Sequence, residues 1–175
     1  TNTPRVINRG DEHRGLDEAL RKLTKGKVNK AQWISTSALW TSGRVLKRRP
    51  IYLDGSGGEH TKDPRTRRCG WGWAQFFEEE EWGQYGDLAG TTQTVPRAEM
   101  AALIHALEAI LAEGDTMNGE TFDLHTDCKY VFDAWQGGFI LAVKGKHGQM
   151  WHKIKKLRER CTNNATRLNL HKVKA

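Results

Sequence analysis

The sequence predicts an α/β protein in which a mixed five-stranded sheet is flanked by helices and preceded by a basic N-terminal extension. Three segments with strand character precede the first long helical pattern, and two more strand-like segments follow it. The predicted order is three strands, a helix, a strand, two helices and a final strand. Such an order is typical of a sheet with both antiparallel and parallel pairs, rather than of a strictly alternating parallel sheet.

The predicted extension, residues 1–50, differs in composition from the rest of the chain. It carries 12 Lys and Arg against 4 Asp and Glu, a net charge of +8, and it ends at Pro50. A short helix is expected to begin near Asp17. Trp33 and Trp40 lie in a stretch rich in Ser and Thr. Basic residues beside tryptophans can bind phosphates and stack on bases, or the segment can pack on the domain; the sequence leaves both open.

The domain expected over residues 51–175 begins with three strands. They are predicted at Ile51–Asp54, Cys69–Phe77 and Trp82–Ala89. The polar, Gly- and Pro-marked segment between the first two predicts a hairpin with a long loop. The four acids Glu78–Glu81 are predicted to form a solvated turn, not a metal site, because adjacent residues on a turn rarely converge.

Residues 97–113 show the clearest helical pattern in the chain. Apolar residues recur at the i, i+3, i+4 and i+7 spacing of one buried face. Thr94 is a suitable cap, Pro96 suits the first turn and Gly114 suits the end. The remaining expected elements are a strand at Thr121–Thr126, a helix at Cys128–Trp135, a basic helix at Gln149–Cys161 and a strand at Leu168–Val173.

Charge is distributed unevenly along the chain. Residues 51–143 carry 6 Lys and Arg against 16 Asp and Glu, a net charge of −10, whereas residues 144–175 carry 10 against 1, a net charge of +9. Basic ends favour a polyanionic partner such as nucleic acid, and an acidic middle can hold cations. A solvated surface with basic tails would give the same distribution.

The cysteines and the apolar runs bear on the cellular setting. Cys69, Cys128 and Cys161 are far apart and form no C-x-x-C pair, so we expect free thiols in a reducing compartment, whether nucleus, cytoplasm or mitochondrion. No apolar run approaches the roughly 18–20 residues of a membrane span, and no signal peptide is visible. We therefore expect no membrane partner.

Three carboxylates occupy conspicuous places in this pattern. Asp54 ends the first strand, Glu99 falls in the first turn of the long helix, and Asp127 ends the fourth strand. A carboxylate at the end of a buried strand needs a hydrogen bond, an ion pair or a cation. Glu99 alone could be stabilised by the helix dipole, and Asp127 alone could cap the next helix.

Taken together, the stretches LDGSGG, TVPRAEMAALIHAL and HTDCKYV resemble the type 1 ribonuclease H family, especially its retroelement domains, over about residues 50–175. The resemblance implies a ribonuclease H-like fold in which Asp54, Glu99 and Asp127 are catalytic. It implies that they bind two Mg²⁺ ions, for which Mn²⁺ can substitute, with Gly55 joining the metal set. It also implies an endonuclease that cuts the RNA strand of RNA–DNA hybrids and leaves 5′ phosphates.

The same resemblance implies where nucleic acid is bound. Ser56, Thr94 and Lys129 correspond to phosphate and sugar contacts of the family. Lys144 and Lys146 open a basic region, residues 144–160, that would hold the phosphates of the other strand. RNA can be sensed through its 2′-hydroxyls across a shallow minor groove.

The sequence also departs from the family pattern. The family has a fourth carboxylate and a histidine in a segment that would follow Ala175, and no acid lies after Glu159. Either the chain continues, or that loop has been lost and the second metal ion is poorly held. Asp133 is expected to be a surface acid. His171 is expected to lie in a strand and not to be catalytic.

These departures leave other functions open. The chain could be a ribonuclease H-like subunit that binds structured RNA in a larger ribonucleoprotein, with catalysis impaired or lost. It could also derive from a retroelement polyprotein. An integrase-type polynucleotidyl transferase is the weakest option, because the glutamate lies on the first helix rather than the last.

Overall fold

The computed structural model describes residues 5–6, 45–57, 68–77 and 80–174. The helix expected near Asp17, the two tryptophans Trp33 and Trp40, and most of the loop expected after Gly57 lie outside the described residues. Every structural statement below concerns the described part of the chain.

The five predicted strands form one mixed sheet. Their bounds are β2 Ile51–Ser56, β3 Gly70–Phe77, β4 Glu80–Asp87, β5 Thr121–Thr126 and β6 Arg167–Lys172. Strands β2, β3 and β4 pair antiparallel, whereas β2 pairs parallel with β5, and β5 with β6. The order β4-β3-β2-β5-β6 places β2 in the middle. The predicted mixed five-stranded sheet is confirmed.

Three features of the sheet differ from the prediction. Strand β2 does not end at Asp54 but continues to Ser56, because its pairing with β3 continues to the Ser56–Gly70 pair, so Asp54 lies inside the strand. A two-residue strand, β1 Arg5–Val6, pairs antiparallel with the outer edge of β4, so that the sheet has six strands. Strand β4 begins at Glu80, not at Trp82, because its pairing with β3 continues to the Phe77–Glu80 pair. The prediction that all of Glu78–Glu81 is a turn was therefore wrong for Glu80 and Glu81: main-chain pairing outweighs the low strand preference of glutamate.

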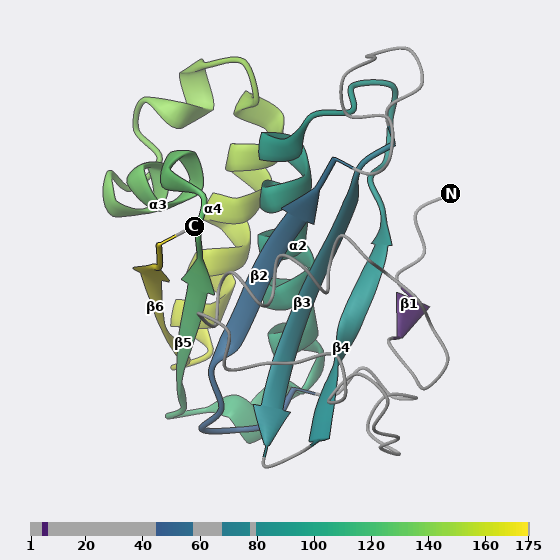
Figure 1. Cartoon of the computed structure of the whole chain (residues 1–175). Coiled ribbons are helices and arrows are strands. Elements are labelled where there is room, and N and C mark those ends of the chain that lie inside the picture. Colours follow the sequence, from purple (N-terminus) through teal and green to yellow (C-terminus); the bar gives the residue numbers. More distant parts are fainter. Residues whose placement is uncertain (1–4, 7–44, 58–67, 78–79, 175) are drawn as a thin grey trace.

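The helices gather on one face of the sheet (Figure 1). Helix α2, Val95–Ala112, packs on β2 and β3, and helix α4, Gly148–Asn163, packs beside α2. Helix α3, Lys129–Gln136, follows β5 directly and contacts β6. Two short 3₁₀ helices complete the fold: η3 Gly114–Met117 and η4 Ala142–Lys144. No described helix is both long and apolar enough to cross a membrane.

The core lies between the sheet and these helices and is rich in aromatic rings. Trp71 and Trp73 of β3 and Trp151 of α4 are fully buried. The ring of Phe139 stacks on Trp151 with centroids 5.7 Å apart, although the backbone of Phe139 has a φ of 68°. A left-handed backbone is costly for such a residue, so burial of its ring must compensate. All three cysteines are free thiols, as predicted.

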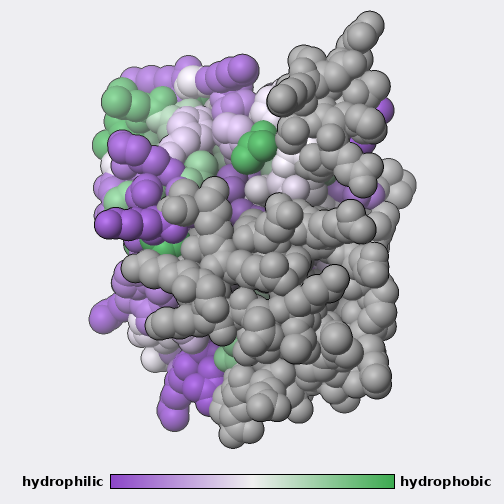
Figure 2. All heavy atoms as spheres, in the orientation of Figure 1, coloured by the Kyte–Doolittle hydropathy of each residue, from purple (hydrophilic) through white to green (hydrophobic). Residues whose placement is uncertain are grey.

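The segment after Phe139 presents apolar side chains to solvent. Ile140 and Leu141 are 69% and 81% exposed. Figure 2 shows a hydrophobic patch at the upper left, where Figure 1 places the end of α3 and the following segment, on an otherwise mainly hydrophilic described surface.

We predict a pH-dependent loss of stability that depends on His105 of α2. Its ring stacks on Trp71 at 3.7 Å, and burial, helped by the charge of Lys153, lowers its pKa to about 4. As the pH falls below about 6.5, the imidazole of His105 takes up a proton in the unfolded chain but stays neutral in the folded chain. The contribution of His105 to the free energy of unfolding is therefore fully present above about pH 6.5 and is lost as the pH falls toward 4.

His105→Phe keeps the stacked ring and removes the titration. Between pH 7 and pH 4.5, its free energy of unfolding in urea should fall by about 2–3 kcal/mol less than that of the unchanged protein. His152→Phe, at an exposed position of α4, serves as the control. An equal fall in the free energy of unfolding for the unchanged protein and for His105→Phe would contradict the role of His105 in the pH dependence.

Candidate active site

The parallel pairing of β2 and β5 brings two of the predicted carboxylates side by side. Ile51 is opposite Leu124, and Tyr52 is opposite His125. Continuing this register, Asp54 is level with Asp127, the first residue after β5. Because the carboxyl ends of parallel strands meet at one edge of a sheet, both side chains reach the same place.

The third carboxylate, Glu99, comes from the start of α2. The sequence placed it in the first turn, but the helix begins at Val95, so Glu99 is its fifth residue and lies beyond the first turn. The dipole explanation for this acid is thereby weakened, because the effect falls off within the first turn. Glu99 is instead 4% exposed and directed at the sheet edge where Asp54 lies.

Gly55 permits this approach of α2 to β2. A Cβ atom at residue 55 would lie 2.5 Å from the backbone nitrogen of Glu99 and 2.8 Å from Cβ of Ala98. Neither contact is sterically possible without moving the helix. A residue without a side chain is therefore required at this point of the central strand.

The three carboxylates form a compact cluster. Asp54, Glu99 and Asp127 each offer one oxygen, and these oxygens lie within 4.8 Å of one another. Burial raises the pKa of Asp54 well above its ordinary value, and the charges of Glu99 and Asp127 raise it further. Oδ2 of Asp54 is buried and has no hydrogen-bond partner among the described residues. Such a set of oxygen ligands fits a divalent cation, which would offset their repulsion.

The cap position of α3 falls on Cys128, not on Asp127, and the side chain of Cys128 makes no capping hydrogen bond. The backbone N–H of Cys128 donates instead to Oγ1 of Thr126, at 3.1 Å. Asp127 is thus placed by the strand and by the turn into α3, which leaves its carboxylate in the cluster.

The predicted nucleic-acid residues lie on different elements. Ser56 is the last residue of β2, and Lys129 opens α3, where it pairs with Asp133. Thr94 occupies the cap position of α2, but its side chain makes no capping bond, and its Oγ1 is buried without a partner among the described residues. Lys144 and Lys146 are exposed before α4.

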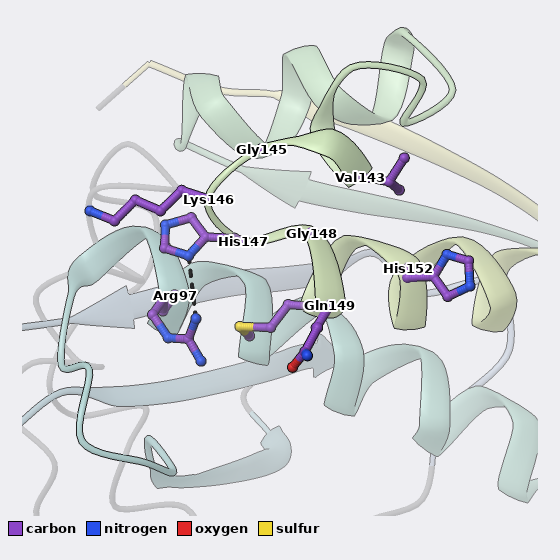
Figure 3. Close-up of a pocket in the computed structure, with 9 residues that line it drawn as sticks. Arg97, Val143, Gly145, Lys146, His147, Gly148, Gln149 and His152 are labelled. Carbon is purple, nitrogen blue, oxygen red and sulfur yellow. Dashed lines mark hydrogen bonds between the residues drawn. The ribbon is translucent and has the colours of Figure 1, made fainter.

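Two residues that the sequence analysis did not single out join Lys146 in a cavity. The cavity has a volume of about 610 Å³ and lies between the starts of α2 and α4. Figure 3 shows Arg97 and His147 facing each other there, with Lys146 beside them. Arg97 lies in TVPRAEMAALIHAL, one of the stretches that carry the family resemblance, so its position could have been noticed from the sequence. No sequence pattern, however, indicates that residues 97 and 147 come together.

Asp133 and His171 lie as predicted. Asp133 is exposed and forms an i, i+4 ion pair with Lys129 on α3. His171 is in β6 and contacts Oδ1 of Asp123 at 2.8 Å. Neither belongs to the acidic cluster.

The comparison with protein families identifies the class. The RNase H family model matches residues 47–175, more than half of the chain, and the chain therefore belongs to the RNase H family. The enzyme class predicted from the sequence motifs is confirmed at this level. No curated protein sequence matches the chain significantly.

Solved structures share the fold at low sequence identity. LC11-RNase H1, isolated from compost by a metagenomic approach, is 21% identical with a TM-score of 0.53, over 74% of this chain and 86% of that one. The prototype foamy virus RNase H domain is 18% identical with a TM-score of 0.50, over 75% and 82%. The foamy viral protease-reverse transcriptase in complex with an RNA/DNA hybrid is 14% identical with a TM-score of 0.52, over 92% and 26%.

We predict that Gly55→Ala disrupts the cluster. The added methyl group must push α2 from β2, which costs stability by about 1–3 kcal/mol, as overpacking of a core does, and moves Glu99 away from Asp54. Gly137→Ala is the matched control, because a Cβ there meets only ordinary contacts, the nearest at 3.4 Å. Urea unfolding of both variants measures the difference; equal stabilities would contradict the steric argument.

Proposed function

We propose that this protein is a metal-dependent endonuclease that hydrolyses the RNA strand of RNA–DNA hybrids. The observation that carries the proposal is the convergence of Asp54, Glu99 and Asp127 from three separate elements, in a chain of the RNase H family. A protein that only bound nucleic acid would have no chemical need for three carboxylates that repel one another in a buried place.

The carboxylate cluster would hold Mg²⁺, with two ions expected and Mn²⁺ as a substitute, close to the backbone of Gly55. Bound divalent ions would lower the pKa of an attacking water and neutralise charge on the leaving 3′ oxygen. The products would then carry 5′ phosphates. The chain's own residues contribute by position: burial orients Asp54, and parallel pairing holds Asp127 level with it.

The cavity between the starts of α2 and α4 would receive a phosphate of the bound nucleic acid. Arg97, Lys146 and His147 line it, and none of the described residues that line it is acidic. Nε of Arg97 is buried without a partner among the described residues, so the guanidinium has unused donor capacity. Thr94 and Ser56 are the proposed hydroxyl contacts nearer the cluster, and Lys129 and Lys144 the proposed peripheral cations.

The class of nucleic acid is inferred from chemistry and likeness together. A family relative of similar fold, the foamy viral protease-reverse transcriptase, is known in complex with an RNA/DNA hybrid. It is a larger protein, of which this chain spans about a quarter. This likeness supports an origin in a retroelement polyprotein more than membership of a ribonucleoprotein.

We predict that Asp127→Asn abolishes cleavage while the protein still folds. Removing one of three converging charges weakens metal binding and leaves the strand pairing intact. Asp115→Asn, at an exposed position of η3, should keep activity within about twofold, since surface changes have small effects. The assay follows a 5′-labelled RNA strand annealed to DNA, with Mg²⁺ or Mn²⁺.

The outcomes separate the candidate functions. Cleavage by the unchanged protein and by the control variant, with no cleavage by Asp127→Asn, establishes the nuclease. Full activity in that variant would remove the carboxylate model. No cleavage by the unchanged protein, with binding of hybrid or structured RNA retained, would favour the RNA-binding subunit of a larger particle.

We further predict that divalent metal stabilises the fold through Asp54. At a metal concentration ten times the dissociation constant, the unchanged protein should gain about 1.4 kcal/mol. Asp54→Asn should not show this gain in the free energy of unfolding. Without metal at pH 8, Asp54→Asn should be at least as stable as the unchanged protein, because one of the three mutually repelling charges is removed. Asp115→Asn, an exposed acid of η3, is the control. Thermal unfolding with Mg²⁺ or EDTA measures both effects; an undiminished metal response in Asp54→Asn would exclude Asp54 as a ligand.

A further inference from the structure

His147 is a nearly buried residue of the cavity between the starts of α2 and α4. It is the residue before α4 and is 8% exposed. Its Nδ1 lies 3.3 Å from Nη1 of Arg97, the third residue of α2, as Figure 3 shows. A guanidinium can only donate hydrogen bonds, so Nδ1 must be the acceptor in this contact. The imidazole is therefore neutral when it accepts from Arg97.

The groups around His147 explain why it is neutral. Arg97 faces it from α2, Lys146 precedes it in its own loop, and the ring of Tyr130 from α3 meets it edge-on at 6.0 Å. His152 of α4 lines the same cavity, and within the described part of the chain no acidic residue lines it. Burial lowers the pKa of His147, and the charges of Arg97 and Lys146 lower it further.

An anion in the cavity would favour the protonated form of His147 over the neutral form. A phosphate group carries negative charge and presents only acceptor oxygens, so it favours the protonated imidazole. Nδ1 would then change from acceptor to donor, and the guanidinium of Arg97, released from His147, would turn its own N–H groups to the phosphate. Three cationic groups, instead of two cations and a neutral ring, would face the anion.

We propose that His147 takes up one proton from solvent when a nucleic-acid phosphate enters this cavity, and releases it when the phosphate leaves, so that binding is linked to pH. The proposal rests on the proposed function for the identity of the anion. It requires no metal ion and no covalent step.

The sign of the effect follows from linkage. His147 is neutral at neutral pH in the free protein and becomes protonated in the complex, so affinity rises as pH falls through the interval between the two pKa values. One linked proton gives at most about tenfold per pH unit inside this interval. We expect the affinity to rise by about three- to tenfold between pH 7.5 and pH 5.5 because of this group.

The experiment measures binding of the full chain to a fluorescein-labelled RNA–DNA hybrid by anisotropy. It is done in EDTA, so that metal-dependent cleavage is blocked, and at constant ionic strength from pH 5.5 to 7.5. The unchanged protein is compared with His147→Asn and His147→Gln, which keep a polar side chain but cannot become cationic. His171→Asn, in β6 and not among the residues that line the cavity, is the control for loss of a histidine elsewhere.

The expected result is a pH slope that is largely lost in both His147 variants and kept in His171→Asn. Thermal unfolding confirms that each variant is folded. In addition, the ring proton resonance of His147 in NMR spectra should titrate at a higher pH with the hybrid than without it. An unchanged slope in the His147 variants, no shift of the ring titration, or no binding at pH 5.5 would overturn the proposal.

This outcome is separable from the test of the nuclease. Cleavage that depends on Asp127, with a pH slope that persists in His147→Asn, would leave the nuclease standing and refute proton-linked binding. A pH slope that depends on His147, without cleavage under any metal condition, would support proton-linked binding and refute the nuclease.

Discussion

The close approach of α2 to β2 at Gly55 is the contact on which the site depends. A helix can come this near to a central strand only where the strand has no side chain, and the backbone of Gly55 lies against Ala98 and Glu99. Without this contact, Glu99 would remain a helix residue at a distance from the sheet edge. With it, an acid from a helix joins two acids placed by strand register, and the three form the candidate metal cluster.

The cluster is costly to the fold by itself, and the rest of the structure has to offset that cost. Burial and two neighbouring acids disfavour the charged form of Asp54. The offset comes from the layer beneath, where Trp71, Trp73 and Trp151 are fully buried and each contributes a large apolar area. A site that opposes stability while the core supports it is typical of functional rather than structural acids.

The parts of this arrangement that are local in sequence could be predicted, and those that depend on distant contacts could not. Helix α2 and the strands β2, β3 and β5 can be predicted from their residue patterns. Asp127 stands out because it directly follows a strand, and Asp54 because it follows a short apolar run, although β2 continues past it to Ser56. The extent of β4 depends on pairing with β3, which strand preference does not encode, and two residues of β1 carry no pattern. The contact of Arg97 with His147 joins positions 50 residues apart through the packing of α4 on α2, and no spacing rule reveals it.

Helix α2 also ties the two halves of the proposed site together. Arg97 and Glu99 are two positions apart, about 200° around the helix axis, so they point in nearly opposite directions from one rigid turn. One faces the basic cavity, and the other faces the acidic cluster. A phosphate held at the cavity therefore has a set separation from any phosphate at the cluster, with no flexible loop between them. A fixed separation of this kind would suit an enzyme that positions a backbone bond of a regular duplex without contacting its bases. The phosphate spacing of the nucleic-acid duplex is the feature that all sequences share.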